Sequence, residues 1–230
     1  MAAAKKLHLY EELLLLGLRD REGTVVADGT AFPYALGGAL LAEFLLHGRI
    51  RIEVVKKKKY LILEDFSSTF DPILDEALEK LGTAKRRATL ESWVSRFAGI
   101  KRLKHRAAEQ LCRRGILRAD EKSVLLIFSR KIYPELDPGP ERALVERLRV
   151  AIFTEAEDLD PETTVLVALA NQAGVLRNVF DKKELKARKK RIQEIGEGDL
   201  TAAAVSDVVK AIQVSIAAAA AAAAAASAAS

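Results

Sequence analysis

Residues 36–55 read LGGALLAEFLLHGRIRIEVV, and this stretch contains the clearest fold signal in the chain. Its first twelve residues predict a strongly apolar helix, which Gly48 ends. The alternating residues 49–55 are followed by four lysines at 56–59 and by YLILE at 60–64. Two short alternating runs around a charged tip predict a β-hairpin. The stretch therefore predicts a helix that leads directly into a hairpin.

Outward from this stretch, the chain is predicted to be mostly helical. Apolar spacing and helix caps, including Asp71-Pro72 and Asp160-Pro161, predict helices at 7–18, 71–81, 89–99, 100–115, 140–155, 161–180, 182–195 and from about 200 onward. Residues 116–137 predict a second hairpin. The pattern of helix, glycine and hairpin thus occurs twice, around Gly48 and Gly115. This order of elements is typical of a winged helix. Because no linker is long enough to split the chain, we expect one mostly helical domain.

The composition argues against several classes of protein. The chain has 230 residues, and its single cysteine excludes an intrachain disulfide framework and a Cys-rich zinc site. Three histidines leave little for a His-based metal centre. The sequence has no GxSxG, P-loop, HExxH or GxGxxG motif. We therefore expect no catalytic residues, no metal, no cofactor and no enzyme activity.

The sequence also gives no sign of a signal peptide or of a membrane span. The apolar run near the N-terminus is only four leucines long and has charges on both sides. The ten alanines at 217–226 are short for a span and only weakly apolar. We expect a cytoplasmic protein, with residues 1–6 as an extension, 7–215 as the domain and 216–230 as an Ala-rich low-complexity tail.

The charge of the chain is unevenly distributed. The whole sequence has 37 basic and 32 acidic residues, a net charge of +5. Residues 85–131 contain 14 basic and 4 acidic side chains, a net charge of +10, which leaves −5 for the rest. Such a segment favours an anionic partner, either nucleic acid, phosphorylated lipid or an acidic protein, although an ordinary solvated helix face is the alternative. The lysines at 56–59 are either a solubilising turn or a finger that faces a membrane or nucleic acid.

The second predicted hairpin combines apolar and basic residues. Its apolar members are Val124, Leu125, Leu126, Ile127, Phe128, Ile132 and Tyr133. A buried strand would explain the run, and the alternative is an exposed hairpin that docks on another subunit or enters a bilayer interface. The neighbouring pair Arg130-Lys131 favours contact with anionic lipid.

Other conspicuous residues have structural explanations. Cys112 is expected to pack at the edge of its helix, and Trp93 to anchor the core. His105, among basic residues, is expected to be solvated. The pair Glu11-Glu12 is expected to line a helix without a catalytic role.

The order of several segments resembles the Golgi phosphoprotein 3 family. They are LYEELLLLGLRDREG (9–23), LLAEFLLHGRIRIE (40–53), DPILDEALEKL (71–81) and RAAEQLCRRGIL (106–117). Proteins of this family are peripheral membrane proteins that bind phosphatidylinositol 4-phosphate, and in eukaryotes they link glycosyltransferase tails to vesicle coats. The resemblance covers about residues 7–215. It implies a mainly α fold class, with a single helical domain around a helix bundle, two short β-hairpins and an apolar hairpin for self-association and membrane contact.

The resemblance also implies positions for a head-group pocket. The family's pocket tryptophan and first arginine fall on Asp28 and Gly37, and its two later arginines fall on Lys101 and Lys104. We therefore expect binding of anionic lipid in general, with Lys101 and Lys104 nearest the phosphate and Arg102 and Arg106 as weaker candidates. Because the long N-terminal extension of the eukaryotic proteins is not seen before Leu7, a bacterial homologue is expected.

These observations lead to a non-enzymatic peripheral membrane or adaptor protein that binds anionic membrane lipid and self-associates through the hairpin at 123–133. A winged-helix-like nucleic-acid-binding protein is the less favoured alternative. A structural oligomer without an anionic ligand is a further one.

Overall fold

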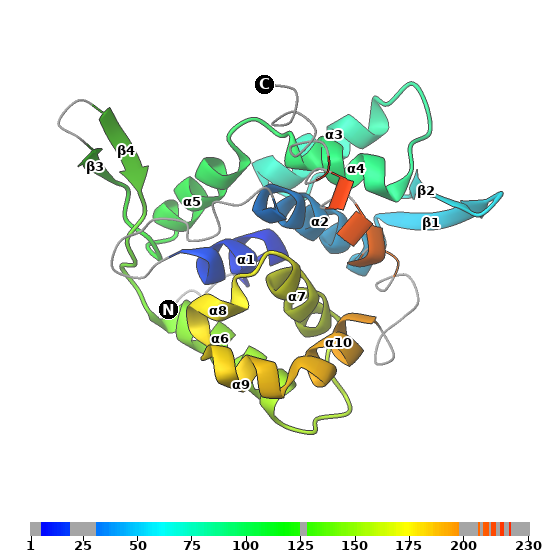
Figure 1. The fold of residues 1–230 in the computed structure, drawn as a ribbon. Coiled ribbons are helices and arrows are strands. Elements are labelled where there is room, and N and C mark those ends of the chain that lie inside the picture. The colour runs from blue at the N-terminus through cyan, green and yellow to red at the C-terminus, as the bar shows by residue number, and fades with distance from the viewer. Residues whose placement is uncertain are drawn as a thin grey trace.

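The computed structural model describes residues 6–18, 31–124 and 128–197, and residues 207, 209–211, 213–214, 217–218 and 221 near the C-terminus. The helices are α1 (Leu9–Gly17), α2 (Ala31–Leu46), α3 (Pro72–Gly82), α4 (Leu90–Ala98), α5 (Leu103–Arg113), α6 (Gly139–Phe153), α7 (Pro161–Gln172), α8 (Leu176–Val179), α9 (Lys182–Ala187) and α10 (Lys189–Glu197). The strands form two separate antiparallel sheets, β1 (Ile50–Val55) with β2 (Lys58–Leu63) and β3 (Asp120–Val124) with β4 (Phe128–Ile132). The predicted mainly α single domain with two short hairpins is confirmed (Figure 1).

Helix α2 lies at the centre of the bundle and packs against α1, α4, α5 and α7 (Figure 1). Residues 35–44 are all buried, which is the expected state of a helix that is apolar on every side. The helix begins at Ala31, earlier than the predicted residue 36. Pro33 lies in its first turn, where a proline is tolerated because the backbone N–H there needs no partner within the helix.

A buried hydrogen-bond network joins α1, α3 and α5 around Asp71. The side chain of Asp71 caps α3 by accepting hydrogen bonds at 2.9 Å from the backbone N–H groups of Ile73 and Leu74. Its other oxygen accepts hydrogen bonds from the Tyr10 hydroxyl at 2.7 Å and from the Gln110 amide at 2.5 Å. The predicted cap is therefore present, and it also connects three helices.

The pair Glu11-Glu12 lines α1 as predicted, but both carboxylates are buried. Glu11 accepts a hydrogen bond from Arg114, after α5, at 2.7 Å. Glu12 accepts one from Arg147 of α6 at 2.6 Å. A buried carboxylate needs such a partner, because burying an ion without one costs on the order of several kcal/mol. The two glutamates therefore fix the positions of neighbouring segments against α1.

His8 extends this network toward α2 and makes the stability dependent on pH. Its Nδ1 lies 2.7 Å from a carboxylate oxygen of Glu43, and its Nε2 lies 4.0 Å from Asp71. Burial lowers the pKa of His8, but the hydrogen bond and charge of Glu43, with the charge of Asp71, outweigh burial and raise the pKa overall. The folded state therefore favours protonated His8.

We expect this contribution to stability to be complete below the unfolded-state histidine pKa of about 6.5 and to be lost as the pH rises through the raised folded-state pKa. Urea-induced unfolding, followed between about pH 5 and pH 9, measures this loss. The variant His8→Gln should show a flatter pH dependence over the same interval. Equal slopes in the variant and the wild type would contradict the assignment to His8.

The first hairpin has a shorter lysine tip than predicted. Val55 pairs with Lys58, so Lys56 and Lys57 alone form the turn. Both turn residues have positive φ angles, of 47° and 66°, as in the two-residue turns that suit the twist of a hairpin. Lys59 lies in β2 and forms an ion pair with Asp207.

Glycines with positive φ end the helices before both hairpins, as predicted, at Gly48 (66°) and Gly115 (73°). Figure 1 shows the two hairpins on different sides of the bundle, with β3 and β4 projecting away from the helices. Each is an isolated two-stranded sheet among the described residues.

Several predicted helices are shorter or divided. The predicted helix at 161–180 is interrupted at Gly174 (φ 72°), which separates α7 from α8. The one at 182–195 is divided into α9 and α10 at Arg188. Most residues of the helix predicted from 200 onward lie outside the described part of the chain. Across the described ranges, no helix has the length and apolar character needed to cross a bilayer.

Candidate functional site

The turn between α4 and α5 exposes two of the predicted site residues, Lys101 and Arg102. Arg102 has a left-handed backbone conformation (φ 56°, ψ 28°), which interrupts the helical path before Leu103. The prediction that the helix starts at residue 100 is therefore wrong, and these two cations precede α5. Lys101 forms no ion pair with any described residue.

The other two predicted residues, Lys104 and Arg106, lie on α5 itself and are half-buried. Arg106 forms an ion pair with Glu76 of α3 and donates a hydrogen bond to the Pro72 carbonyl at 3.3 Å. It therefore holds α5 against α3. Arg102 forms an ion pair with Glu109 at 3.2 Å, across two turns of the same region. Both arginines are already engaged with carboxylates, so the exposed Lys101 is the strongest of the four candidates for an anion.

The positive charge of residues 85–131 is partly neutralised by carboxylates from elsewhere in the chain. The pairs are Arg87–Glu53, Arg106–Glu76 and Arg114–Glu11. The exposed cations of this segment that form no ion pair within the described ranges are Lys85, Arg86, Arg96, Lys101 and Arg113. Arg96 lies 4.6 Å from the centre of the Trp93 ring. Trp93 is buried, which confirms its predicted position in the core. The net charge counted along the sequence thus overstates the charge that a partner meets.

The second hairpin is attached to α5 through Tyr133 and Lys131. The Tyr133 hydroxyl lies 3.0 Å from Nδ1 of His105, and Lys131 lies 3.5 Å from Glu109. Tyr133 is only 3% exposed, so its predicted role in membrane or subunit contact is wrong, and it anchors the hairpin instead. His105 is half-buried, not solvated as predicted. Its pKa is lowered by burial and by the charges of Lys104 and Arg102.

The apolar run of this hairpin does not form one continuous strand. Val124 ends β3 and pairs with Phe128, which begins β4, at the end of the hairpin farthest from Tyr133. Leu125, Leu126 and Ile127 lie outside the described residues. Ile132 is half-buried at the base. Val124 and Phe128 therefore belong to two paired strands, and whether the apolar run is buried stays a prediction, because its side chains lie outside the described residues.

The loop before α3 exposes an aromatic side chain that the sequence analysis did not single out. Phe70 is 88% exposed and has a φ angle of 58°, which is unfavourable for a bulky side chain. The loop is held by Asp75, which accepts hydrogen bonds from Ser68 at 2.6 Å and from the backbone and hydroxyl of Thr69 at 2.7 and 2.6 Å. A fixed loop therefore presents Phe70 to solvent, two residues before the Pro72 carbonyl that Arg106 contacts.

The two pocket positions that departed from the family pattern have different outcomes. Asp28 lies outside the described residues. Gly37 lies where α2 crosses α4, and a Cβ atom there would be 2.6 Å from the Val94 carbonyl oxygen and 2.7 Å from the Ala98 nitrogen. No side chain fits at this position. An arginine of a head-group pocket therefore has no equivalent here.

Sequence reasoning missed a basic cavity formed by the C-terminal helices. Lys182, Lys186 and Lys189 line it, together with Arg177. The three lysines are four and three residues apart in sequence. This spacing was a usable signal, because residues so spaced lie on the same side of a predicted helix. Cys112, in contrast, lies half-buried on α5 as predicted, and burial raises the pKa of its thiol.

Comparison with known proteins gives two findings. The family model described as Golgi phosphoprotein 3 (GPP34) matches residues 9–212. The chain is 26% identical over 223 residues to the vacuolar protein sorting-associated protein 74 of Schizosaccharomyces pombe. This alignment covers 84% of the chain and 66% of the relative, so the chain spans slightly less than two thirds of the relative's length. The relative is eukaryotic and gives no support to the expected bacterial origin.

Proposed function

Because the chain belongs to the Golgi phosphoprotein 3 (GPP34) family, we propose that it is a peripheral membrane adaptor that binds anionic lipid head groups. The proteins of this family are adaptors rather than enzymes, and membership fits a lipid-binding adaptor in general. The observation that carries the proposal is the exposed Lys101 next to Lys104 at the α4–α5 turn. Lysine attracts a phosphate as a point charge but lacks the planar fork of arginine. The proposed ligand is therefore an acidic phospholipid, of which a phosphoinositide is one example.

Apolar side chains supply the second part of the proposal. Interfacial binding combines attraction of cations to anionic lipid, worth about 1 kcal/mol per suitably placed cation, with burial of apolar side chains. The hairpin run at 124–128 and the exposed Phe70 are the proposed apolar contacts. Phe70 supports this role because an exposed aromatic in a strained backbone conformation is unfavourable unless a partner covers it. The hairpin is also the proposed surface for self-association.

Co-sedimentation with liposomes tests the lipid site. We expect binding to phosphatidylserine or phosphoinositide vesicles at low salt and none to neutral vesicles. The double variant Lys101→Glu/Lys104→Glu should weaken this binding by at least about tenfold, because it replaces the attraction of two cations to the anionic lipid by the repulsion of two carboxylates. The matched control Lys56→Glu/Lys57→Glu makes the same charge change at the β1–β2 turn and should leave binding within about twofold.

Further arms of the experiment separate the apolar contacts and the alternatives. Phe70→Ser, or the double variant Leu125→Ser/Leu126→Ser, should weaken vesicle binding without removing its dependence on salt. The hairpin variant should also lower the mass measured by light scattering if the hairpin mediates self-association. Absence of binding to every anionic vesicle would refute the lipid proposal. Displacement by duplex DNA at low concentration would favour a nucleic-acid-binding protein instead.

A further inference from the structure

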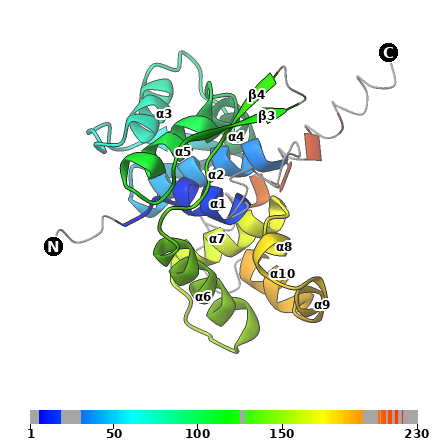
Figure 2. The ribbon, with the colours of Figure 1, turned by 90° about the vertical axis from the view of Figure 1, so that its left-hand side faces the viewer.

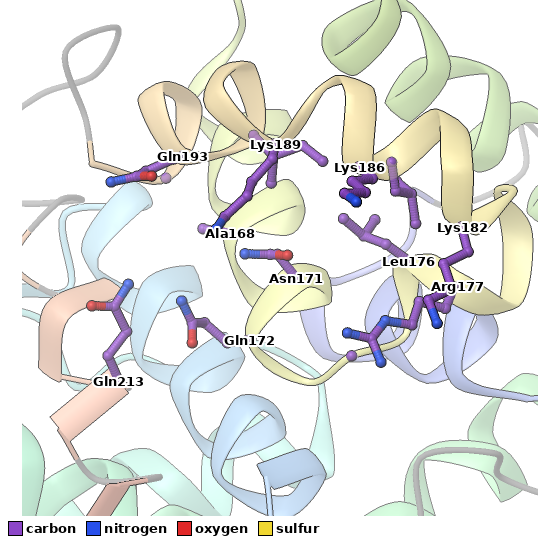
Figure 3. A pocket seen from close by; sticks show the side chains of 14 residues that line it. Ala168, Asn171, Gln172, Leu176, Arg177, Lys182, Lys186, Lys189, Gln193 and Gln213 are labelled. Carbon is purple, nitrogen blue, oxygen red and sulfur yellow. The ribbon is translucent and has the colours of Figure 1, made fainter.

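A second cationic site lies in the C-terminal half of the domain, in a cavity of about 690 Å³ between α7, α8, α9 and α10. We infer that this cavity binds a small phosphorylated polyol or sugar. Its volume lies within the range of about 300–1,000 Å³ that is typical of small-molecule sites. Gln213, from the C-terminal helical residues, completes the wall (Figure 3).

The charge of the cavity points to an anion. Four cations line it, Arg177, Lys182, Lys186 and Lys189, and no aspartate or glutamate is among the lining residues. None of the four forms an ion pair with a residue in the described part of the chain. Like charges gathered without a counter-ion repel one another, and a bound anion relieves that repulsion.

Three carboxylates, Asp181, Glu155 and Glu194, are engaged elsewhere, and Glu184, between Lys182 and Lys186 on α9, is not among the residues that line the cavity. Asp181 caps α9 by accepting a hydrogen bond from the backbone N–H of Lys183 at 2.7 Å. Glu155 pairs with Arg188 at 2.7 Å, and Glu194 lies 3.3 Å from Lys190. None of these four carboxylates lines the cavity, so its cations face an opening that an external anion can enter.

The uncharged lining points to hydroxyl groups on the ligand. Figure 3 shows the amides of Asn171 and Gln172 from α7, Gln193 from α10 and Gln213 around the same opening as the lysines. A primary amide both donates and accepts hydrogen bonds, as a hydroxyl group does, so the two are complementary. Leu176 provides an apolar part of the wall. Phosphates on a hydroxyl-bearing ring satisfy both sets of groups.

This site is separate from the proposed lipid site. In Figures 1 and 2, α8, α9 and α10 lie at one end of the molecule, and α5 with its hairpin lies at the other, with α1 and α2 between them. The cavity proposal therefore does not depend on whether Lys101 and Lys104 bind lipid.

Isothermal titration calorimetry with inositol trisphosphate at physiological ionic strength tests the inference. We expect saturable binding, no binding of myo-inositol, and weaker binding of inorganic phosphate. The variant Lys186→Glu/Lys189→Glu should lower the affinity for inositol trisphosphate by more than about tenfold, because each charge-assisted hydrogen bond to phosphate is strong. The matched control Lys183→Glu/Lys190→Glu changes the same charge on the same two helices outside the cavity and should stay within about twofold.

The outcomes distinguish the sources of the ligand. Loss of phosphoinositide-vesicle binding in the cavity variant, in parallel with loss of soluble binding, would support a lipid head group. Unchanged vesicle binding with loss of soluble binding would support a free phosphate ester. Absence of saturable binding, equal losses in both charge variants, or equal affinity for inorganic phosphate and inositol trisphosphate would overturn the inference. Lys101→Glu/Lys104→Glu should retain the calorimetric signal, so failure of the lipid proposal leaves this result intact.

Discussion

Replacing Gly37 with alanine is expected to lower the free energy of unfolding by about 2–3 kcal/mol, although helix propensity alone predicts a gain of about 1 kcal/mol. The added Cβ would lie 2.6 Å from the Val94 oxygen and 2.7 Å from the Ala98 nitrogen. Both are backbone atoms of α4, so no side chain can rotate away, and the two helices must separate. Because propensity and packing predict opposite signs, urea-induced unfolding followed by circular dichroism gives a clear answer.

Gly99→Ala is the matched control, since Gly99 follows α4 and its added Cβ would meet only the Arg96 and Ser95 oxygens at 3.4 and 3.6 Å. We expect its free energy of unfolding to remain within about 1 kcal/mol of the wild type. A Gly37→Ala protein as stable as the wild type would contradict the close approach of α2 and α4. Gly37→Arg, which introduces the family's residue, should be less stable still and should not improve lipid binding.

Features that depend on a few neighbouring residues could be predicted from the sequence. The Asp71-Pro72 cap, the end of α2 before Gly48 and the position of both hairpins all follow from local backbone chemistry. The start of α5 could not be predicted in this way. Residues 100–102 continue the apolar and basic spacing of the helix, but Arg102 adopts a left-handed conformation that spacing does not reveal.

Features of the candidate site depend on segments that are distant in sequence. The charge excess of residues 85–131 could be counted, but its reduction by Glu11, Glu53 and Glu76 required the fold. Burial of Tyr133 against His105 likewise joins the residue after β4 to α5 across 28 residues. Lys101 and Lys104 were found from the sequence because the resemblance supplied an alignment, and their use as a lipid site stays a prediction.

Asp71→Ala is expected to lower the free energy of unfolding by about 3–5 kcal/mol. Loss of a helix cap accounts for about 1 kcal/mol, and each buried donor left without a partner adds about 1–3 kcal/mol. The Tyr10 hydroxyl loses its acceptor, and the Gln110 amide loses one of its two acceptors but keeps its hydrogen bond to the Tyr10 hydroxyl at 2.9 Å. Denaturation measures the total. Hydrogen exchange at the Ile73 and Leu74 amides measures the loss of the helix cap by itself, because Asp71 accepts hydrogen bonds from both of these N–H groups.

Asp71→Asn separates hydrogen bonding from charge. Its remaining oxygen can still cap α3, while its NH₂ group faces the Tyr10 hydroxyl and the Gln110 amide. The hydroxyl can turn to accept, and Gln110 can flip, because its Oε1 has no hydrogen-bond partner among the described residues. We therefore expect a loss of only about 1–2 kcal/mol, with protection of Ile73 and Leu74 retained. If asparagine were as destabilising as alanine, the negative charge beside His8, rather than the hydrogen bonds, would be the main contribution of Asp71.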